Sequence, residues 1–166
     1  IAAHQFGYTN VVASMGTALT EQQVAQLRPM APHFVLALDP DTAGQEATHR
    51  SLESSWQGFE RAAVGRAAVG PLYAQDKHVD LFIASLPTGV DPDDLIRKDP
   101  KAWKSLIRDA EPVLDFLIDS IPTRYDLTDA RGRAQALDVI SPLIPATLDP
   151  TEQERHFAKL ASVLGV

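Results

Sequence analysis

The sequence contains no cysteine, so disulfide bonds and thiolate zinc sites are excluded. It also lacks any apolar run of about 18 residues, the length that a transmembrane helix needs. No signal peptide opens the chain. From these absences we expect a cytoplasmic location and no membrane partner.

Basic residues are scarce relative to acidic ones. The chain has 15 Lys and Arg against 22 Asp and Glu, which gives a formal net charge of −7. This balance argues against a nucleic-acid binder that acts through bulk positive charge. An acidic metal site that acts on phosphates remains compatible with it. The length of 166 residues and the hydrophobic content of 45% predict one domain, or one domain with a small appendage.

A run of apolar residues, Phe34 to Leu38, leads directly into Asp39-Pro40-Asp41. Such a run is typical of a strand buried on both faces of a parallel sheet, and a helical pattern begins near Thr42. Asp39 and Asp41 then stand at the carboxyl edge of the sheet, where α/β proteins bind ligands. Two carboxylates at positions i and i+2 can converge, and Mg²⁺ is the usual ion between them. The same residues also fit a turn followed by a helix cap.

A second acidic group follows the strand predicted over residues 79–86. Asp91-Pro92-Asp93-Asp94 has the composition of a capped helix start, and capping explains Asp91 as well as metal binding does. Asp99-Pro100 and Asp149-Pro150 have the same shape, but neither follows an obvious strand. Because only Asp39 and Asp91 follow apolar β-like runs, we expect both at one edge of the sheet.

The remaining pattern divides the chain into two units. Residues 1–110 are predicted to form an α/β unit, which includes a helix end capped by Gly7, a short strand at 10–14 and a mobile insert around the tandem repeat at 61–70. Residues 111–166 are predicted to form an antiparallel helical unit, with helices over 112–121, 128–144 and 149–164. We expect the acids of this unit on solvent faces, so packing or docking is its predicted role. We expect the chain's histidines at surface or edge positions rather than as metal ligands.

Three motifs occur in order along the chain: residues 12–20 (VASMGTALT), 39–44 (DPDTAG) and 89–98 (GVDPDDLIRK). Together they resemble the Toprim domain of bacterial DNA primases of the DnaG type. Residues 111–166 resemble, more loosely, the helical subdomain that follows Toprim in the primase catalytic core. The resemblance implies an α/β Toprim fold, with a Rossmann-like, mostly parallel sheet and flanking helices, followed by a small all-α subdomain.

The resemblance also implies a chemistry. Primases of this family join nucleoside triphosphates into a short RNA primer on a single-stranded DNA template, at the replication fork in the cytoplasmic nucleoid. Asp39 and Asp41 match the family's metal ligands for Mg²⁺ or Mn²⁺. Asp91 and Asp93 match the acids of its later motif, so the expected catalytic residues are Asp39, Asp41 and Asp91, and the expected metal ligands add Asp93.

The sequence departs from the family in what it does not contain. The Glu-Gly-Tyr-Met-Asp-like motif would stand just before Ile1, and the zinc-binding domain, the basic amino-terminal part and the helicase-binding carboxyl domain are also absent. We therefore expect a fragment that is inactive alone, that meets the replicative helicase only through a domain absent here, and that leaves a gap, a non-native pairing or a self-association beside residues 34–38.

Three other interpretations remain open from the residues. One is a Rossmann-like metal-dependent phosphatase or phosphotransferase that uses Asp39 as its nucleophile. Another is a different Toprim protein, such as a nuclease. The third is a non-catalytic helical docking module with a degenerate acidic site.

Overall fold

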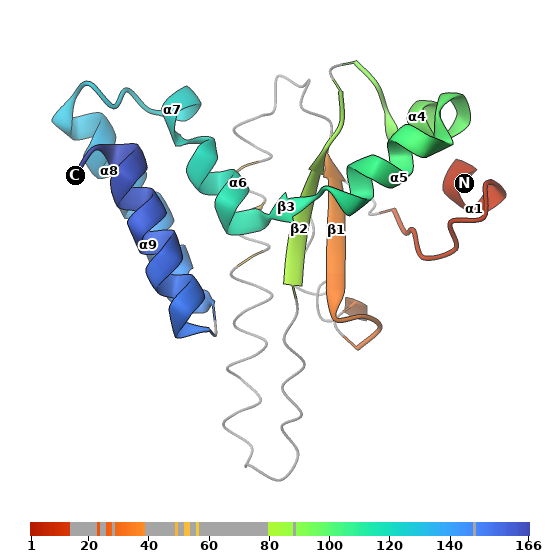
Figure 1. The fold of residues 1–166 in the computed structure, drawn as a ribbon, viewed down its shortest axis with the longest axis horizontal. Helices are drawn as coiled ribbons and strands as arrows, with labels where there is room; N and C mark the ends of the chain where they lie inside the picture. The colour runs from red at the N-terminus through yellow and green to blue at the C-terminus, as the bar shows by residue number, and fades with distance from the viewer. Residues whose placement is uncertain are drawn as a thin grey trace, which may run out of the picture.

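The structure is a computed structural model, in which a small central sheet has helices on both sides (Figure 1). It describes residues 1–13, 23, 26–27, 29–38, 49, 52–53, 56, 80–87, 89–147 and 149–166. Among these residues the elements follow the order α1 (Ala2–Gln5), β1 (His33–Leu38), β2 (Asp80–Ser85), α4 (Pro92–Lys98), α5 (Pro100–Arg108), β3 (Glu111–Pro112), α6 (Val113–Asp119), α7 (Ile121–Arg124), α8 (Ala130–Ile140), the 3₁₀ helix η1 (Ser141–Ala146) and α9 (Pro150–Leu164). None of the helices in these ranges is long and apolar enough to cross a membrane.

The sheet has the strand order β1-β2-β3. Strands β1 and β2 are parallel, with Leu38 opposite Ser85, and this confirms the two strands and the parallel arrangement expected from the sequence. The two-residue strand β3 runs antiparallel to β2, with Glu111 opposite Ile83. We had expected only helix in this region, because a strand of two residues leaves no alternating pattern in the sequence.

Strand β1 is less buried than its apolar sequence predicts. Its residues are partly buried, apart from the exposed His33. Phe34, Leu36 and Leu38 pack on one side of the sheet and Ala37 packs on the other, so both faces contact apolar groups. Among the described strands β1 ends the sheet, and the gap, non-native pairing or self-association expected beside residues 34–38 stays a prediction. Residues 11–13, expected in a short strand, have no regular secondary structure.

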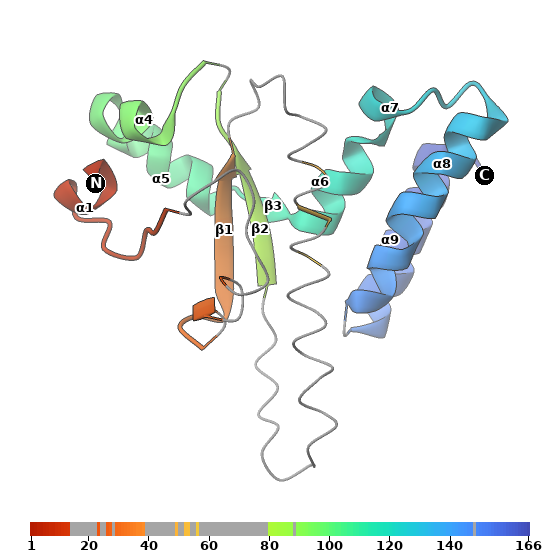
Figure 2. The same ribbon diagram turned by 180° about the vertical axis from the view of Figure 1, so that it is seen from behind.

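Two hydrophobic cores lie on opposite sides of the sheet (Figure 2). The larger core joins Leu81 and Ile83 of β2 to the buried faces of α6, α7, α8, η1 and α9. The smaller core joins the end of β2 to α1, α4 and α5, and it consists of Ala3, Leu86, Leu95, Ile96 and Trp103. Because both cores use residues of β2 or its end, this strand sets the position of both groups of helices.

The Asp-Pro sequences begin helices, as their composition predicts. Asp91 accepts a hydrogen bond from the backbone N–H of Asp94 at 2.7 Å, and Asp149 accepts one from Thr151 at 2.8 Å. Asp99 accepts hydrogen bonds from two backbone N–H groups at the start of α5. In each case proline follows in the first turn, where its missing N–H costs no hydrogen bond.

The helices of the second unit differ in detail from the prediction. The helix expected over 112–121 ends at Asp119, and Ser120 separates it from the short α7. The helix expected over 128–144 ends at Ile140 and continues as the 3₁₀ helix η1, whose two prolines cannot donate backbone hydrogen bonds. The helix expected over 149–164 is confirmed as α9, and Gly165 ends it with a φ of 72°.

Candidate metal centre and charged surfaces

The carboxyl ends of β1 and β2 lie at one edge of the sheet. Leu38 is opposite Ser85, and the N–H of Leu86 donates to the carbonyl oxygen of Leu38 at 2.9 Å. The chain leaves β2 at this edge, passes Gly89 with a φ of 73°, and reaches Asp91 at the start of α4. The parallel strand arrangement on which the expected metal site depends is therefore present. Asp39 and Asp41 themselves lie outside the described residues.

Asp91 and Asp93 are both exposed and lie at the start of α4. One carboxylate oxygen of Asp91 accepts the capping hydrogen bond. The second oxygen is the type of metal ligand that Mg²⁺ and Mn²⁺ prefer. Asp93 pairs with Arg97 through Oδ2 and Nε at 2.7 Å, with both side chains about half exposed. Because Arg97 already offsets its charge, Asp93 suits a cation less well than Asp91. The described part of the chain contains no cluster of three or more His, Asp or Glu side chains suited to a metal.

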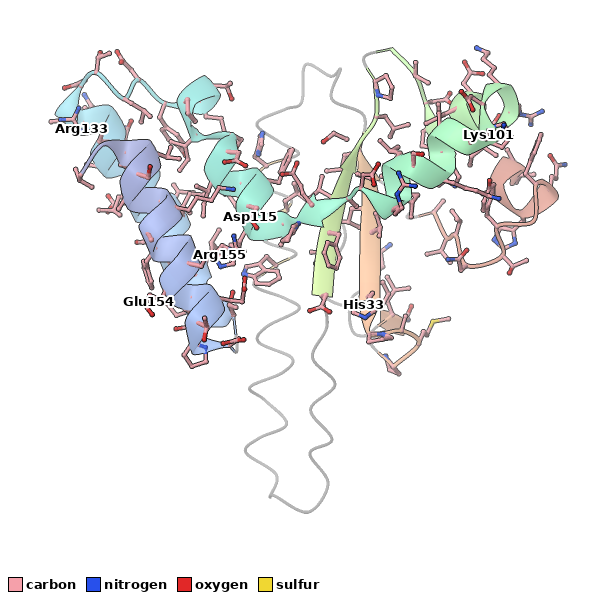
Figure 3. The ribbon with its side chains drawn as sticks, in the orientation of Figure 1. His33, Lys101, Asp115, Arg133, Glu154 and Arg155 are labelled. Atoms are coloured by element: carbon pink, nitrogen blue, oxygen red, sulfur yellow. The ribbon has the colours of Figure 1, made fainter. Side chains whose placement is uncertain are left out.

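The helical part contains a charged cluster that the sequence analysis missed (Figure 3). Asp115 of α6 is only 8% exposed. Its two carboxylate oxygens accept hydrogen bonds from Nη1 and Nη2 of Arg155 at 3.0 and 2.9 Å. Nζ of Lys159 donates to it at 2.8 Å. The expectation that the acids of this unit lie on solvent faces is therefore wrong for Asp115.

The cluster shifts the pKa values of its members. Burial by itself would raise the pKa of Asp115, but the hydrogen bonds from Arg155 and Lys159 outweigh burial and lower this pKa to about 2. For Lys159, burial would lower the pKa, yet the hydrogen bonds to Asp115 and Asp119 raise it. Because three N–H donors occupy the carboxylate of Asp115, its role is to fasten α6 to α9.

Two histidines are buried, contrary to the expectation of surface positions. His156 of α9 is 4% exposed, and its Nε2 lies 3.0 Å from Nη2 of Arg155. Burial, reinforced by the positive charge of Arg155, lowers the pKa of His156. His49 is 8% exposed and stacks on the ring of Phe116, with 5.4 Å between the ring centres. His49 meets Phe116, and Nε2 of His156 also lies 3.8 Å from Oδ2 of Asp115. Both partners are far away in the sequence, so the spacing of residues along the chain gave no signal for this burial.

An apolar groove lies between α8 and α9. Its large exposed side chains are Leu137, 45% exposed, Phe157, 43% exposed, and the terminal Val166, 85% exposed. Arg133 and Ala134 of α8, and Leu160, Ala161 and Leu164 of α9, complete the lining. The side chains of α9 that line the groove recur at helical spacing, so the groove follows one face of that helix.

Comparison with known proteins gives the family. A family model described as Toprim-like matches residues 1–96. The chain belongs to the Toprim-like family. This confirms the Toprim resemblance drawn from the three motifs. A second model, described as the DnaB-helicase binding domain of primase, matches residues 114–166. We had expected the helicase-binding domain to be absent, and this match corrects that expectation.

The relatives of this Toprim chain are DNA primases. It is 33% identical over 167 residues to the DNA primase of Clostridium acetobutylicum, a match that covers 100% of the chain and 25% of that protein. It is 31% identical over 166 residues to the DNA primase of Lactococcus lactis, and this match covers 99% of the chain and 23% of that protein. The chain thus spans about a quarter of the length of these relatives.

Solved structures agree with this relationship. The Escherichia coli primase catalytic core superposes with a TM-score of 0.74 at 29% identity, which covers 99% of the chain and 48% of that structure. A DnaG primase catalytic domain bound to single-stranded DNA superposes with a TM-score of 0.72 at 28% identity, which covers 97% of the chain and 47% of that structure. The chain is therefore homologous to the catalytic core of DnaG-type primases. The division at residue 110 stays a prediction.

Proposed function

We propose that this chain supplies the acidic metal centre of a DNA primase. In this reaction a ribose hydroxyl of the growing RNA attacks the α-phosphate of a nucleoside triphosphate, a new phosphodiester forms, and pyrophosphate leaves. The template is single-stranded DNA. The observation that carries the proposal is the shared edge of β1 and β2, where Leu38 is opposite Ser85, in a chain homologous to primase cores.

The proposed ligands are Asp39, Asp41 and Asp91, with Asp93 bound directly or through water. All are carboxylates, the donor type that Mg²⁺ and Mn²⁺ prefer. The bound ion would neutralise charge on the triphosphate and on the leaving pyrophosphate. Asp91 suits this role because the capping hydrogen bond from Asp94 occupies one of its carboxylate oxygens and leaves the second for a cation. Asp93 would first have to weaken its pairing with Arg97.

The test is the affinity of the chain for Mn²⁺, measured by electron paramagnetic resonance. Asp91→Asn should weaken binding about tenfold or more, because it removes one charged ligand. Asp149→Asn is the matched control, since Asp149 also precedes proline and also caps a helix. Asparagine caps helices as well as aspartate does, so neither variant should unfold the chain. Equal Mn²⁺ affinity in the two variants would contradict the proposal for Asp91.

We also propose that the 166 residues alone do not make primers, because a polymerase needs a longer template-binding surface than this acidic chain offers. Primer synthesis from ribonucleotides on single-stranded DNA, measured with the isolated chain and Mn²⁺, should be undetectable. Any template-dependent product would overturn this expectation.

A second proposal concerns the helical part. The match to the DnaB-helicase binding model favours docking of the replicative helicase on residues 114–166. The apolar groove between α8 and α9 is the proposed contact, because Leu137 and Phe157 expose large apolar surfaces there.

The docking test compares the double variant Leu137→Gln and Phe157→Gln with Met30→Gln. Met30 is 73% exposed and lies outside the helical part, which makes it a control for loss of an exposed apolar side chain. The double variant should lose helicase binding by at least tenfold in calorimetry, because apolar anchors contribute most to such contacts. Unchanged affinity for the helicase of the same organism would exclude the groove as the contact.

A further inference from the structure

Helix α5 carries a stripe of positive charge. Lys101, Lys104 and Arg108 occur at positions i, i+3 and i+7, which places them on one face of the helix. All three are exposed, and Lys101 is labelled in Figure 3. The stripe extends over about 10 Å at 1.5 Å per residue.

This stripe is unusual for so acidic a protein. Residues 97–108 contain five of the chain's 15 basic residues and only one acid, Asp99. The rest of the chain is strongly negative. The carboxylate of Asp99 is already occupied as the helix cap. Three of the five basic residues lie on α5 and two end α4, so the positive charge here is a local feature that the overall charge of −7 conceals.

The basic residues of this region differ in how they are paired. Arg97 and Lys98 of α4 pair with Asp93 and Asp94 at 2.7 and 2.8 Å. Arg108 pairs with its neighbour Asp109. Lys101 and Lys104, by contrast, have no ion-pair partner among the residues that the structure describes. Two lysines of the stripe are thus available to an external anion.

The opposite face of α5 is held rigidly. Trp103 is 4% exposed and packs in the smaller core, and the ring of Tyr8 meets its ring edge-on at 6.3 Å. Ala102, Leu106 and Ile107 pack against the same core. Because this face is anchored, the lysines project from a fixed surface and lose little further backbone freedom on binding.

We propose that Lys101 and Lys104 of α5 bind the phosphate backbone of single-stranded nucleic acid. This inference rests on the proposed primase function, and it assigns part of the template or primer contact to an element next to the acidic edge. Only Asp99 separates α5 from α4, the helix whose start carries Asp91. A strand held on α5 would therefore pass beside the proposed metal centre, and its contact would be independent of base sequence.

The test is the salt dependence of single-stranded DNA binding by the full 166-residue chain, measured by fluorescence anisotropy with a labelled oligothymidylate. Chelator is present throughout, so that no cation can bridge the DNA to the acidic edge. For single strands, each phosphate contact contributes about 0.7 to the slope of log affinity against log salt. Lys104→Gln should reduce the slope by about 0.7, and Lys101→Gln with Lys104→Gln by about 1.4.

Arg131→Gln is the matched control. Arg131 is exposed on α8, on the other side of the sheet from α5, and its loss changes the net charge equally (Figure 1). Glutamine is a good helix former, so all variants should stay folded, which circular dichroism checks. The proposal is overturned if the lysine variants keep the slope of the Arg131 variant, or if the unsubstituted chain binds no DNA at low salt. Either result leaves the Mn²⁺ test of Asp91 unaffected, so the two failures are distinguishable.

Discussion

The cluster around Asp115 gives the sharpest prediction about stability. Replacing Asp115 with asparagine keeps the shape of the side chain but removes the charge that Arg155 and Lys159 bind. Because the folded-state pKa is about 2 against an ordinary value of 3.8, the linked contribution at neutral pH is at most about 2 kcal/mol. The side chain of Arg155 is 45% exposed, so solvent screening reduces the expected loss to about 1–2 kcal/mol.

The sign of the pH dependence follows from the lowered pKa. The contribution of Asp115 is fully present above its unfolded-state pKa near 4, and it is lost as pH falls toward the folded-state value near 2. The difference in unfolding free energy between the unsubstituted chain and Asp115→Asn should therefore be constant from pH 7 to 5. It should fall to about half by pH 3.

Urea unfolding followed by circular dichroism at several pH values measures this difference. Glu152→Gln is the control, because Glu152 also pairs with Arg155 but is 46% exposed, and it should cost less than about 0.5 kcal/mol. The reasoning is refuted if Asp115→Asn costs no more than Glu152→Gln. It is also refuted if the cost of Asp115→Asn is the same at pH 3 as at pH 7.

Three further predictions concern the backbone, a cap and a buried histidine. Gly132→Ala should destabilise the fold by more than about 2 kcal/mol in thermal unfolding, since the added Cβ would lie 1.9 Å from the carbonyl oxygen of Asp126. Gly165→Ala is the control: there is open space around Gly165, and only its φ of 72° would be strained, so the loss should be about 1 kcal/mol. Asp149→Ala should cost about 1 kcal/mol by urea unfolding, because it removes the cap of α9, and an unchanged midpoint would count against that role. For His156, whose folded-state pKa is lowered, stability should fall as pH drops below about 6.5, and His156→Gln should remove this decline. A proton NMR titration that gives His156 an ordinary pKa in the folded chain would contradict the prediction that burial lowers it.

The features that sequence reasoning predicted well are local ones. The strand from Phe34 to Leu38 follows from an unbroken apolar run, and the starts of α4, α5 and α9 follow from Asp-Pro pairs. A cap involves residues within about three positions of each other, so its components are adjacent in the sequence. The order of the three motifs along the chain likewise indicates the Toprim family, which the family match confirms.

The features that it missed depend on contacts between distant residues. Asp115 and Arg155 are 40 positions apart, and no periodicity links α6 to α9. The one available signal was that Arg155 and Lys159 share a face of α9 at spacing i, i+4, which would suit a common acidic partner. The buried positions of His49 and His156 were missed for the same reason.

By itself, the amino-acid sequence determined strands β1 and β2, the starts of α4, α5 and α9, and the acidic motifs, because hydrophobic periodicity and capping act over a few neighbouring residues. Only the tertiary structure decided which side of the sheet each helix covers, that β3 joins β2 in the opposite direction, and that Asp115 is buried against two cations. The physical reason is that burial and ion pairing depend on distance in space, and folding brings together groups that the chain itself keeps far apart.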